Sequence, residues 1–283
     1  MRFGFSFVAV GAGTLLTLLT LAALTGCGGS GGGAREPPAP VNPPPVIIPP
    51  PAGGGFTTQM FGAIGADDVD LDSEGEEITV WVAPDGRFRF MWLDYLNWEH
   101  GDALFTGTLT FDGNGFRGVG LAYAGSDTTW SDGSTVTTVA VTAEIIGYEG
   151  EWEWKKVAGT WSTAAGDHGR FELTENHCRC STDTALQHLE GPWSGHETGS
   201  WSDVSLTVNA DGSFAGEGGD GCTLGGRFSP ADDYSGFYDL QLSVGGCSRA
   251  GDYVGLAARD NWYDVFYVSA DDGRYAVTYV LFR

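Results

Sequence analysis

Cysteine is the residue type whose spacing in this chain most directly suggests chemistry. Cys222 precedes the segment TLGGRF and Cys247 follows the segment YDLQLSV, and both segments have the composition of strands. An antiparallel hairpin of these strands would bring the two thiols together, so we predict a Cys222–Cys247 disulfide with a Cα–Cα distance of about 4.4 to 6.8 Å. Cys178 and Cys180 would then pair with each other. In the alternative arrangement, each of them pairs with one of the later cysteines.

Metal binding is a second possibility for the segment HCRC. The residues concerned are His177, Cys178, Cys180 and the later His188. Their spacing matches no usual zinc arrangement, so disulfide chemistry is the preferred interpretation. The acidic run DDVDLDSEGEE, residues 67–77, lacks the glycine and the final bidentate glutamate of a helix-loop-helix calcium site. We therefore expect a solvated acidic loop there, and neither a metal nor another cofactor.

Catalytic motifs do not occur in the two modules that the sequence predicts. The zinc-hydrolase pattern H-E-x-x-H is missing, the nucleophile pattern G-x-S-x-G is matched only by the glycine-rich stretch GGSGG at residues 28–32, before these modules, and none of the 45 glycines forms a phosphate-binding loop. Carboxylates are plentiful, but no pair is singled out by its spacing for acid–base work. We therefore predict that the protein is not an enzyme.

Tryptophan is the residue type that most suggests binding, because the chain has ten of them. Several in the first half lie beside acidic or turn residues. Core packing accounts for most, whereas exposed tryptophans could stack on a sugar or anchor a protein interface. The candidate binding residues are Trp92, Trp98, Trp130, Trp152 and Trp154.

The elements that must position these residues are short strands with a period of two. In the segment ALFTGTLTF, Phe105, Leu109 and Phe111 face one way and the threonines face the other. Asp-Gly pairs, which suit tight hairpin turns, separate such runs. The stretches VAPDGRF, residues 82–88, and VNADGSF, residues 208–214, are near twins. Each predicts the end of a strand, a turn and the start of the returning strand.

The number of these strands predicts an all-β fold of two tandem, small, antiparallel up-and-down β-barrels. Residues 56–177 and 189–283 each contain enough strands to close a barrel, which removes exposed sheet edges. The connector between them, residues 178–188, is polar and irregular. The last strand, RYAVTYVLFR, is apolar on both faces. We expect one face to fill its own barrel, and the other to pack against the first module or to bind a ligand.

The N-terminal region has a different composition. Residues 1–26 have the order of a secretory signal peptide: a charge, an apolar run and a small-residue cleavage site. Residues 27–55 hold nine of the twelve prolines and few apolar side chains, so we predict a disordered tether. The signal ends in LTGC, which resembles a bacterial lipoprotein lipobox. The resemblance implies that Cys27 is lipidated and that Gly28 directs the protein to the outer membrane.

The charge balance restricts the partners. Thirty-seven acidic residues against 14 basic ones give a formal charge of −23. Such a field repels phosphate backbones, so nucleic acid is excluded as a partner. The membrane is expected to be contacted through the lipid anchor.

Two resemblances to known proteins bear on the fold and the function. The segment GPWSGHETGSWSDVSLTVNADGSFAGE resembles the first hairpin of avidin and, more loosely, of lipocalins, in which G-x-W opens the first strand. The whole chain, with its lipobox, tether, PDGRF turn and final YDLQLSVGGC module, resembles uncharacterised bacterial two-module β-barrel lipoproteins. These resemblances imply an outer-membrane lipoprotein, periplasmic or surface-exposed. We expect a non-catalytic binding surface for a protein or glycan; the alternative is a lipocalin- or avidin-like carrier of a small ligand.

Overall fold

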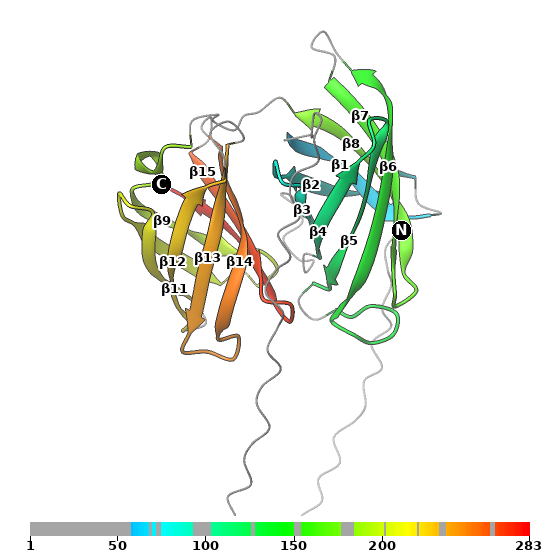
Figure 1. The fold of residues 1–283 in the computed structure, drawn as a ribbon. Coiled ribbons are helices and arrows are strands. Elements are labelled where there is room, and N and C mark those ends of the chain that lie inside the picture. The colour runs from blue at the N-terminus through cyan, green and yellow to red at the C-terminus, as the bar shows by residue number, and fades with distance from the viewer. Residues whose placement is uncertain are drawn as a thin grey trace, which may run out of the picture. The chain divides into compact units, whose positions relative to one another are not determined.

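The computed structural model of this chain is built from antiparallel strands (Figure 1). It describes residues 58–67, 70–71, 75–92, 103–125, 128–149, 154–176, 184–200, 202–219, 221–231, 236–260 and 264–283. In these ranges it contains strands β1 to β16 and one short 3-10 helix, η1. The strands form two closed barrels, both within the compact unit Pro49–Arg283. The predicted all-β fold is therefore confirmed.

The first barrel is an up-and-down barrel of eight strands, coloured blue to green in Figure 1. Its strands are β1 (Thr58–Ala66), β2 (Glu76–Val82), β3 (Arg87–Trp92), β4 (Leu104–Phe111), β5 (Gly115–Tyr123), β6 (Val136–Glu149), β7 (Trp154–Thr163) and β8 (His168–Asn176). Each strand pairs with the next along the chain, and β1 pairs with β8 to close the barrel. Closure leaves no unpaired strand edge in the ring.

The second barrel repeats this strand order, from yellow-green to red in Figure 1. It comprises η1 (Leu186–His188), β9 (Gly191–Glu197), β10 (Asp203–Val208), β11 (Ser213–Gly218), β12 (Thr223–Pro230), β13 (Phe237–Gly245), β14 (Gly251–Asp260), β15 (Val265–Asp271) and β16 (Ala276–Phe282). Strand β16 pairs with β9 to close it. Two tandem up-and-down barrels were predicted, and both are confirmed.

Each barrel interior contains one cluster of contacting, buried side chains to which all eight strands contribute, as alternation of inward and outward residues requires. The largest fully buried side chains of both clusters are aromatic. Those of the first barrel include Phe88, Phe90, Phe105, Phe116 and Phe171, and those of the second include Trp193, Phe228, Tyr238, Tyr253 and Phe266. These interiors hold hydrophobic cores.

The twin stretches of the sequence form equivalent turns in the two barrels. The β2–β3 and β10–β11 turns each connect the second and third strands of their barrel. Gly86 and Gly212 have φ angles of 85° and 81°, a left-handed conformation that suits glycine. The fourth strand fixes both turns in the same way, since Leu109 donates to the carbonyl of Gly86 at 2.8 Å and Phe228 to that of Gly212 at 2.9 Å. The repeat in the sequence is thus one turn used at the same position of two barrels.

Candidate functional site

One outer face of the first barrel is covered by the second barrel. Trp81, Phe237 and Leu256 are fully buried in an apolar cluster formed by outward residues of both barrels. The ring centroids of Trp81 and Phe237 lie 5.8 Å apart. Ala276, on the outward face of the last strand, packs against this cluster, whereas its neighbour Val277 belongs to the second-barrel core. One face of this strand therefore fills its own barrel, as expected, and on the other face Ala276 packs against the first barrel whereas Phe282 is 43% exposed.

Arginines of the first barrel bind aspartates of the second at the edge of this contact. Arg89 pairs with Asp271, and both side chains are largely buried. The hydroxyl of Tyr123 donates to Asp271 at 2.8 Å. Burial, followed by the charge of Asp271, raises the pKa of Tyr123 far above its usual value and keeps the hydroxyl protonated. A second pair joins Arg87 to Asp239 at 2.5 Å. The outer face of the second barrel therefore recognises guanidinium groups through carboxylates.

The outer face of the second barrel carries a groove on strands β16, β9, β10 and β11, which adjoins the counterpart of the covered face of the first barrel. When the sequences of the twin turns are aligned, Thr207 and Glu217 correspond to Trp81 and Met91. Trp81 and Met91 are buried against the second barrel, whereas Thr207 and Glu217 are exposed. We call this depression the second-barrel groove. It has a volume of about 670 Å³ and opens to solvent, and its lining residues are Ser194, Gly195, His196, Asp203, Val204, Ser205, Glu217, Gly218, Gly219 and Phe282.

The groove results from a row of small residues between two larger ones. Phe282, Ser194, Ser205 and Glu217 are cross-strand neighbours on β16, β9, β10 and β11. The two serines and nearby glycines leave space between the phenyl ring and the glutamate. His196 lies opposite Asp203 in the next row and contacts the phenyl ring of Phe282, with ring centroids 6.3 Å apart. One end of the groove is thus aromatic and the other is acidic.

The electrostatics of the groove favour positive charge. Asp203 and Glu217 are exposed, and neither forms an ion pair with an arginine or lysine in the described part of the chain. Burial lowers the pKa of His196, and the nearby Asp203 only partly opposes this. His196 is therefore mostly neutral near pH 7, so the two carboxylates give the groove a net negative charge.

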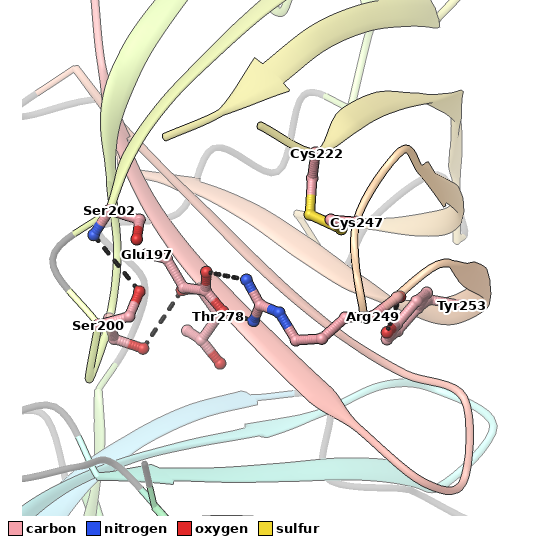
Figure 2. A network of polar contacts seen from close by, with 9 residues as sticks. Glu197, Ser200, Ser202, Cys222, Cys247, Arg249, Tyr253 and Thr278 are labelled. Carbon is pink, nitrogen blue, oxygen red and sulfur yellow. Dashed lines mark hydrogen bonds and ion pairs between the residues drawn. A yellow bond between two sulfur atoms is a disulfide. The ribbon is translucent and has the colours of Figure 1, made fainter. Parts of the chain in front are cut away.

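A network behind the groove fastens one end of the second barrel (Figure 2). Glu197, next to His196 on β9, is buried and accepts two hydrogen bonds from Arg249. The turn that carries Arg249 is also held by the Cys222–Cys247 disulfide, whose Cα atoms are 5.0 Å apart. The predicted disulfide and its Cα distance are therefore confirmed. Tyr253 donates to the carbonyl of Arg249 at 2.7 Å, and burial, with a smaller contribution from Asp272, raises its pKa to about 12.

Trp193, from the G-x-W of the sequence, is held in place by polar and cationic contacts in the same barrel. Its Nε1 donates to the carbonyl of Leu189 at 2.7 Å. The guanidinium of Arg283 lies 4.6 Å from the centroid of the Trp193 ring, within the range of a cation–π contact. Both ends of the strand β9 are therefore fixed: one by Trp193 and the other by Glu197.

The predicted binding tryptophans that the structure describes lie against the core of the first barrel. Trp92 and Trp130 are half-buried around Phe105, at centroid distances of 4.7 Å and 6.1 Å. The indole Nε1 of Trp130 donates to the carbonyl of Ala122 at 3.1 Å. The binding role of these tryptophans stays a prediction.

Other predicted residues fall outside the described part of the chain. These are Cys27, Trp98, Trp152, Cys178 and Cys180. Trp154 begins β7, but its side chain is not described. The groove residues were not predicted as a site. Alternation in DVSLTV already marks Asp203 and Ser205 as outward, but their proximity to Phe282 depends on barrel closure between β16 and β9.

The role of the described part of the chain is indicated neither by a metal site nor by similarity to known proteins. Among the described residues, no three or more histidine, cysteine, aspartate or glutamate side chains are placed to hold a metal ion. No helix in the described ranges is long and apolar enough to cross a membrane. Comparisons with protein-family models, with curated proteins and with solved structures find no match to this chain.

Proposed function

We propose that this protein is a lipid-anchored lipoprotein of the bacterial outer membrane that presents a non-catalytic binding surface to a protein or glycan partner. The second-barrel groove is the surface we assign to this role. The observation that carries the proposal is the groove itself: it is an open depression on the outer face of strands β16, β9, β10 and β11, and at Glu217 it adjoins positions whose counterparts in the first barrel are covered.

The filled barrel interiors favour recognition on the outside over the carriage of a small ligand. In carriers built on small barrels, the ligand occupies a cavity among the inward side chains. Here those side chains form one buried cluster in each barrel. Displacing them would expose apolar surface and disrupt close packing. The carrier alternative therefore has less support than an external site.

The groove residues support binding more than hydrolysis. Ser194, Ser205, His196 and Asp203 are the residue types of a hydrolytic triad. Such a triad also needs donors that stabilise an oxyanion. Strands β9 and β10 are paired on both sides, so their backbone amides serve the barrel ladder. We therefore regard the surface as non-catalytic.

The N-terminal sequence supports an anchored position. LTGC at residues 24–27 supplies the lipidation signal, and residues 28–55 supply a proline-rich spacer. A polyproline II conformation of about 3.1 Å per residue, with flexible glycine ends, gives a reach of roughly 60 to 80 Å. Such a tether would let the barrels meet partners away from the bilayer.

Lipidation is tested by changing Cys27→Ala. Because two or three acyl chains anchor stably, the wild-type protein should remain with membranes after cell fractionation, and the variant should be released. The double variant Cys178→Ala/Cys180→Ala, which removes thiols outside the lipobox, should stay membrane-bound. Membrane retention of Cys27→Ala would contradict the assignment.

The binding surface is tested by retention of envelope components on the purified mature protein. Ser205→Arg places a long cation in the groove and should abolish retention of the partner. Thr142→Arg introduces an arginine at an exposed position of β6, outside the groove, and this variant should still retain the partner. The proposal fails if no envelope component is retained, or if both variants retain the same components as the wild type.

A further inference from the structure

We infer that the second-barrel groove binds a basic segment of a protein, with an arginine or lysine side chain between Asp203 and Glu217. The inference rests on the proposed function and specifies the partner of that same site. It assigns each end of the groove a role: the carboxylates bind the cation, and Phe282 with His196 contacts the apolar part of the segment.

The two carboxylates are placed to share one cation. Asp203 on β10 and Glu217 on β11 occupy diagonal positions on the same outward face. Diagonal neighbours in an antiparallel pair have Cβ atoms about 7 to 8 Å apart, so one guanidinium or ammonium can lie between the two side chains. The described part of the chain provides no arginine or lysine partner for either carboxylate.

The contact between the barrels is an internal precedent for this chemistry. There, two arginines on the outer face of the first barrel meet two aspartates on the outer face of the second, in the pairs Arg87–Asp239 and Arg89–Asp271. Arginine suits this task because its planar guanidinium keeps its charge and presents several donors in a fixed geometry. A partner using the groove would repeat the pairing of a cation with outward carboxylates.

The shape of the groove fits a short extended segment that is recognised through its side chains. Four strands, β16, β9, β10 and β11, span three spacings of about 4.8 Å, or about 14 Å, the length of roughly four extended residues. These strands are paired on both sides, so the segment cannot be added as a further strand. Phe282, with 43% of its surface exposed, offers a ring to the aliphatic part or the charge of an adjacent side chain.

The overall charge supports a cationic partner over the other classes. With 37 acidic and 14 basic residues, the chain attracts cations at long range and repels anionic glycans. A neutral glycan could hydrogen-bond to the serines and stack on Phe282, but its binding would gain nothing from the charge of the two carboxylates. Binding of a neutral glycan is therefore the alternative that the experiment must distinguish from binding of a basic segment.

The experiment is calorimetric titration of the mature protein at low salt with the peptide Arg-Ser-Arg-Ser-Arg-Ser. The matched probe replaces each arginine with citrulline, which keeps the shape and removes the charge. We expect the arginine peptide to bind at least about tenfold more tightly than the citrulline peptide. We also expect Asp203→Asn/Glu217→Gln to weaken its binding about tenfold, since two exposed ion pairs with the peptide would be lost together.

A control variant separates the groove from the general field of the protein. Glu77→Gln/Glu144→Gln removes two exposed charges from the first barrel and should change the affinity less than about twofold. Phe282→Ala should weaken binding about threefold through the lost ring contact. Thermal unfolding checks the fold of each variant. If the double groove variant does not fold, Glu217→Gln alone should still weaken binding about threefold.

Three results would overturn the inference. The first is equal binding of the arginine and citrulline peptides. The second is equal loss of binding in the groove and control variants. The third is groove-dependent binding of the neutral oligosaccharide cellohexaose without binding of the arginine peptide. Each result leaves the proposed binding function intact, because that function fails only if the envelope retention experiment fails.

Discussion

The two barrels share strand order and a turn, yet use the same outer face in different ways. In the first barrel this face carries Trp81, Met91 and Arg89 and is covered by the second barrel. In the second barrel the positions that correspond to Trp81 and Met91 carry Thr207 and Glu217, which are exposed, and Glu217 lines the open groove. The difference shows how a repeated fold can assign one copy of a face to internal assembly and leave the other for a partner.

The barrels also differ in how their strands are fixed. The second has the Cys222–Cys247 disulfide, the Glu197–Arg249 pair and the Arg283–Trp193 contact. The described part of the first barrel has no disulfide, and aromatic contacts around Phe105 occupy one region of its core instead. The strand β9, which lines the groove, is thus held through both Trp193 and Glu197, as a preformed binding surface requires.

The largest expected effect comes from the ion pair at the covered face. Arg89→Met leaves Asp271 buried without its cation, and removing one partner of a buried pair typically costs about 3 to 5 kcal/mol. The free energy of unfolding from urea titration should fall by that amount. Arg227→Met, which removes the exposed pair with Asp211, should leave it nearly unchanged. Similar effects of the two substitutions would contradict the assignment of covered and uncovered faces.

The disulfide provides the next effect. Cys222→Ala/Cys247→Ala releases a cross-link between residues 25 apart, which in the chain-entropy model contributes about 3 to 4 kcal/mol. Amide hydrogen exchange should increase first in β12, β13 and β14 of the second barrel. Faster amide exchange confined to the first barrel would show that the disulfide does not stabilise the second barrel specifically.

The twin turns should respond alike. An added Cβ at Gly86 would lie 2.7 Å from the carbonyl oxygen of Leu109, and one at Gly212 would lie 2.3 Å from that of Phe228. With the left-handed backbone, Gly86→Ala and Gly212→Ala should each lower the free energy of unfolding by about 2 kcal/mol. Gly113→Ala has the same sign of φ but no neighbour within 4 Å, so its effect should be smaller. A large loss of stability from only one of these two substitutions would show that the two turns are not equivalent.

The smallest expected effect is the pH dependence of binding in the groove. Burial lowers the pKa of His196. Asp203 on β10 is a titratable group opposite it, and on β16 its neighbours Val280 and Phe282 do not titrate. Because the pKa of His196 lies below the ordinary histidine value of about 6.5, its protonation adds positive charge only at a pH below that value. Binding of the arginine peptide should therefore weaken about two- to threefold between pH 7.5 and about pH 5.5. His196→Gln should remove this step.

Histidine protonation also has a definite sign for stability. Because the pKa of His196 is lower in the folded state, the unfolded chain binds the proton at higher pH. The contribution of this group to stability is thus complete above the unfolded pKa and declines as the pH falls through it. A gain in stability over this interval that His196→Gln removes would contradict the direction of the shift.

Much of the fold could be predicted from the sequence because it depends on local patterns. Alternation placed Val204, Leu206 and Val208 in a core, Asp-Gly pairs marked the turns, and the Cys222–Cys247 hairpin followed from neighbouring strands. The groove could not be predicted, because it depends on closure between the first and last strands of one barrel. The covered face likewise depends on contacts between residues as distant as Arg89 and Asp271.

The most direct test of the second-barrel groove as a binding surface maps the bound arginine peptide on the mature protein by amide NMR chemical shifts. We expect the largest shifts on Ser194, His196, Asp203, Ser205 and Glu217, and no change at the covered face around Trp81. Shifts of the inward core residues, or shifts concentrated on any other outer face, would contradict the claim that the uncovered face of the second barrel is the binding surface.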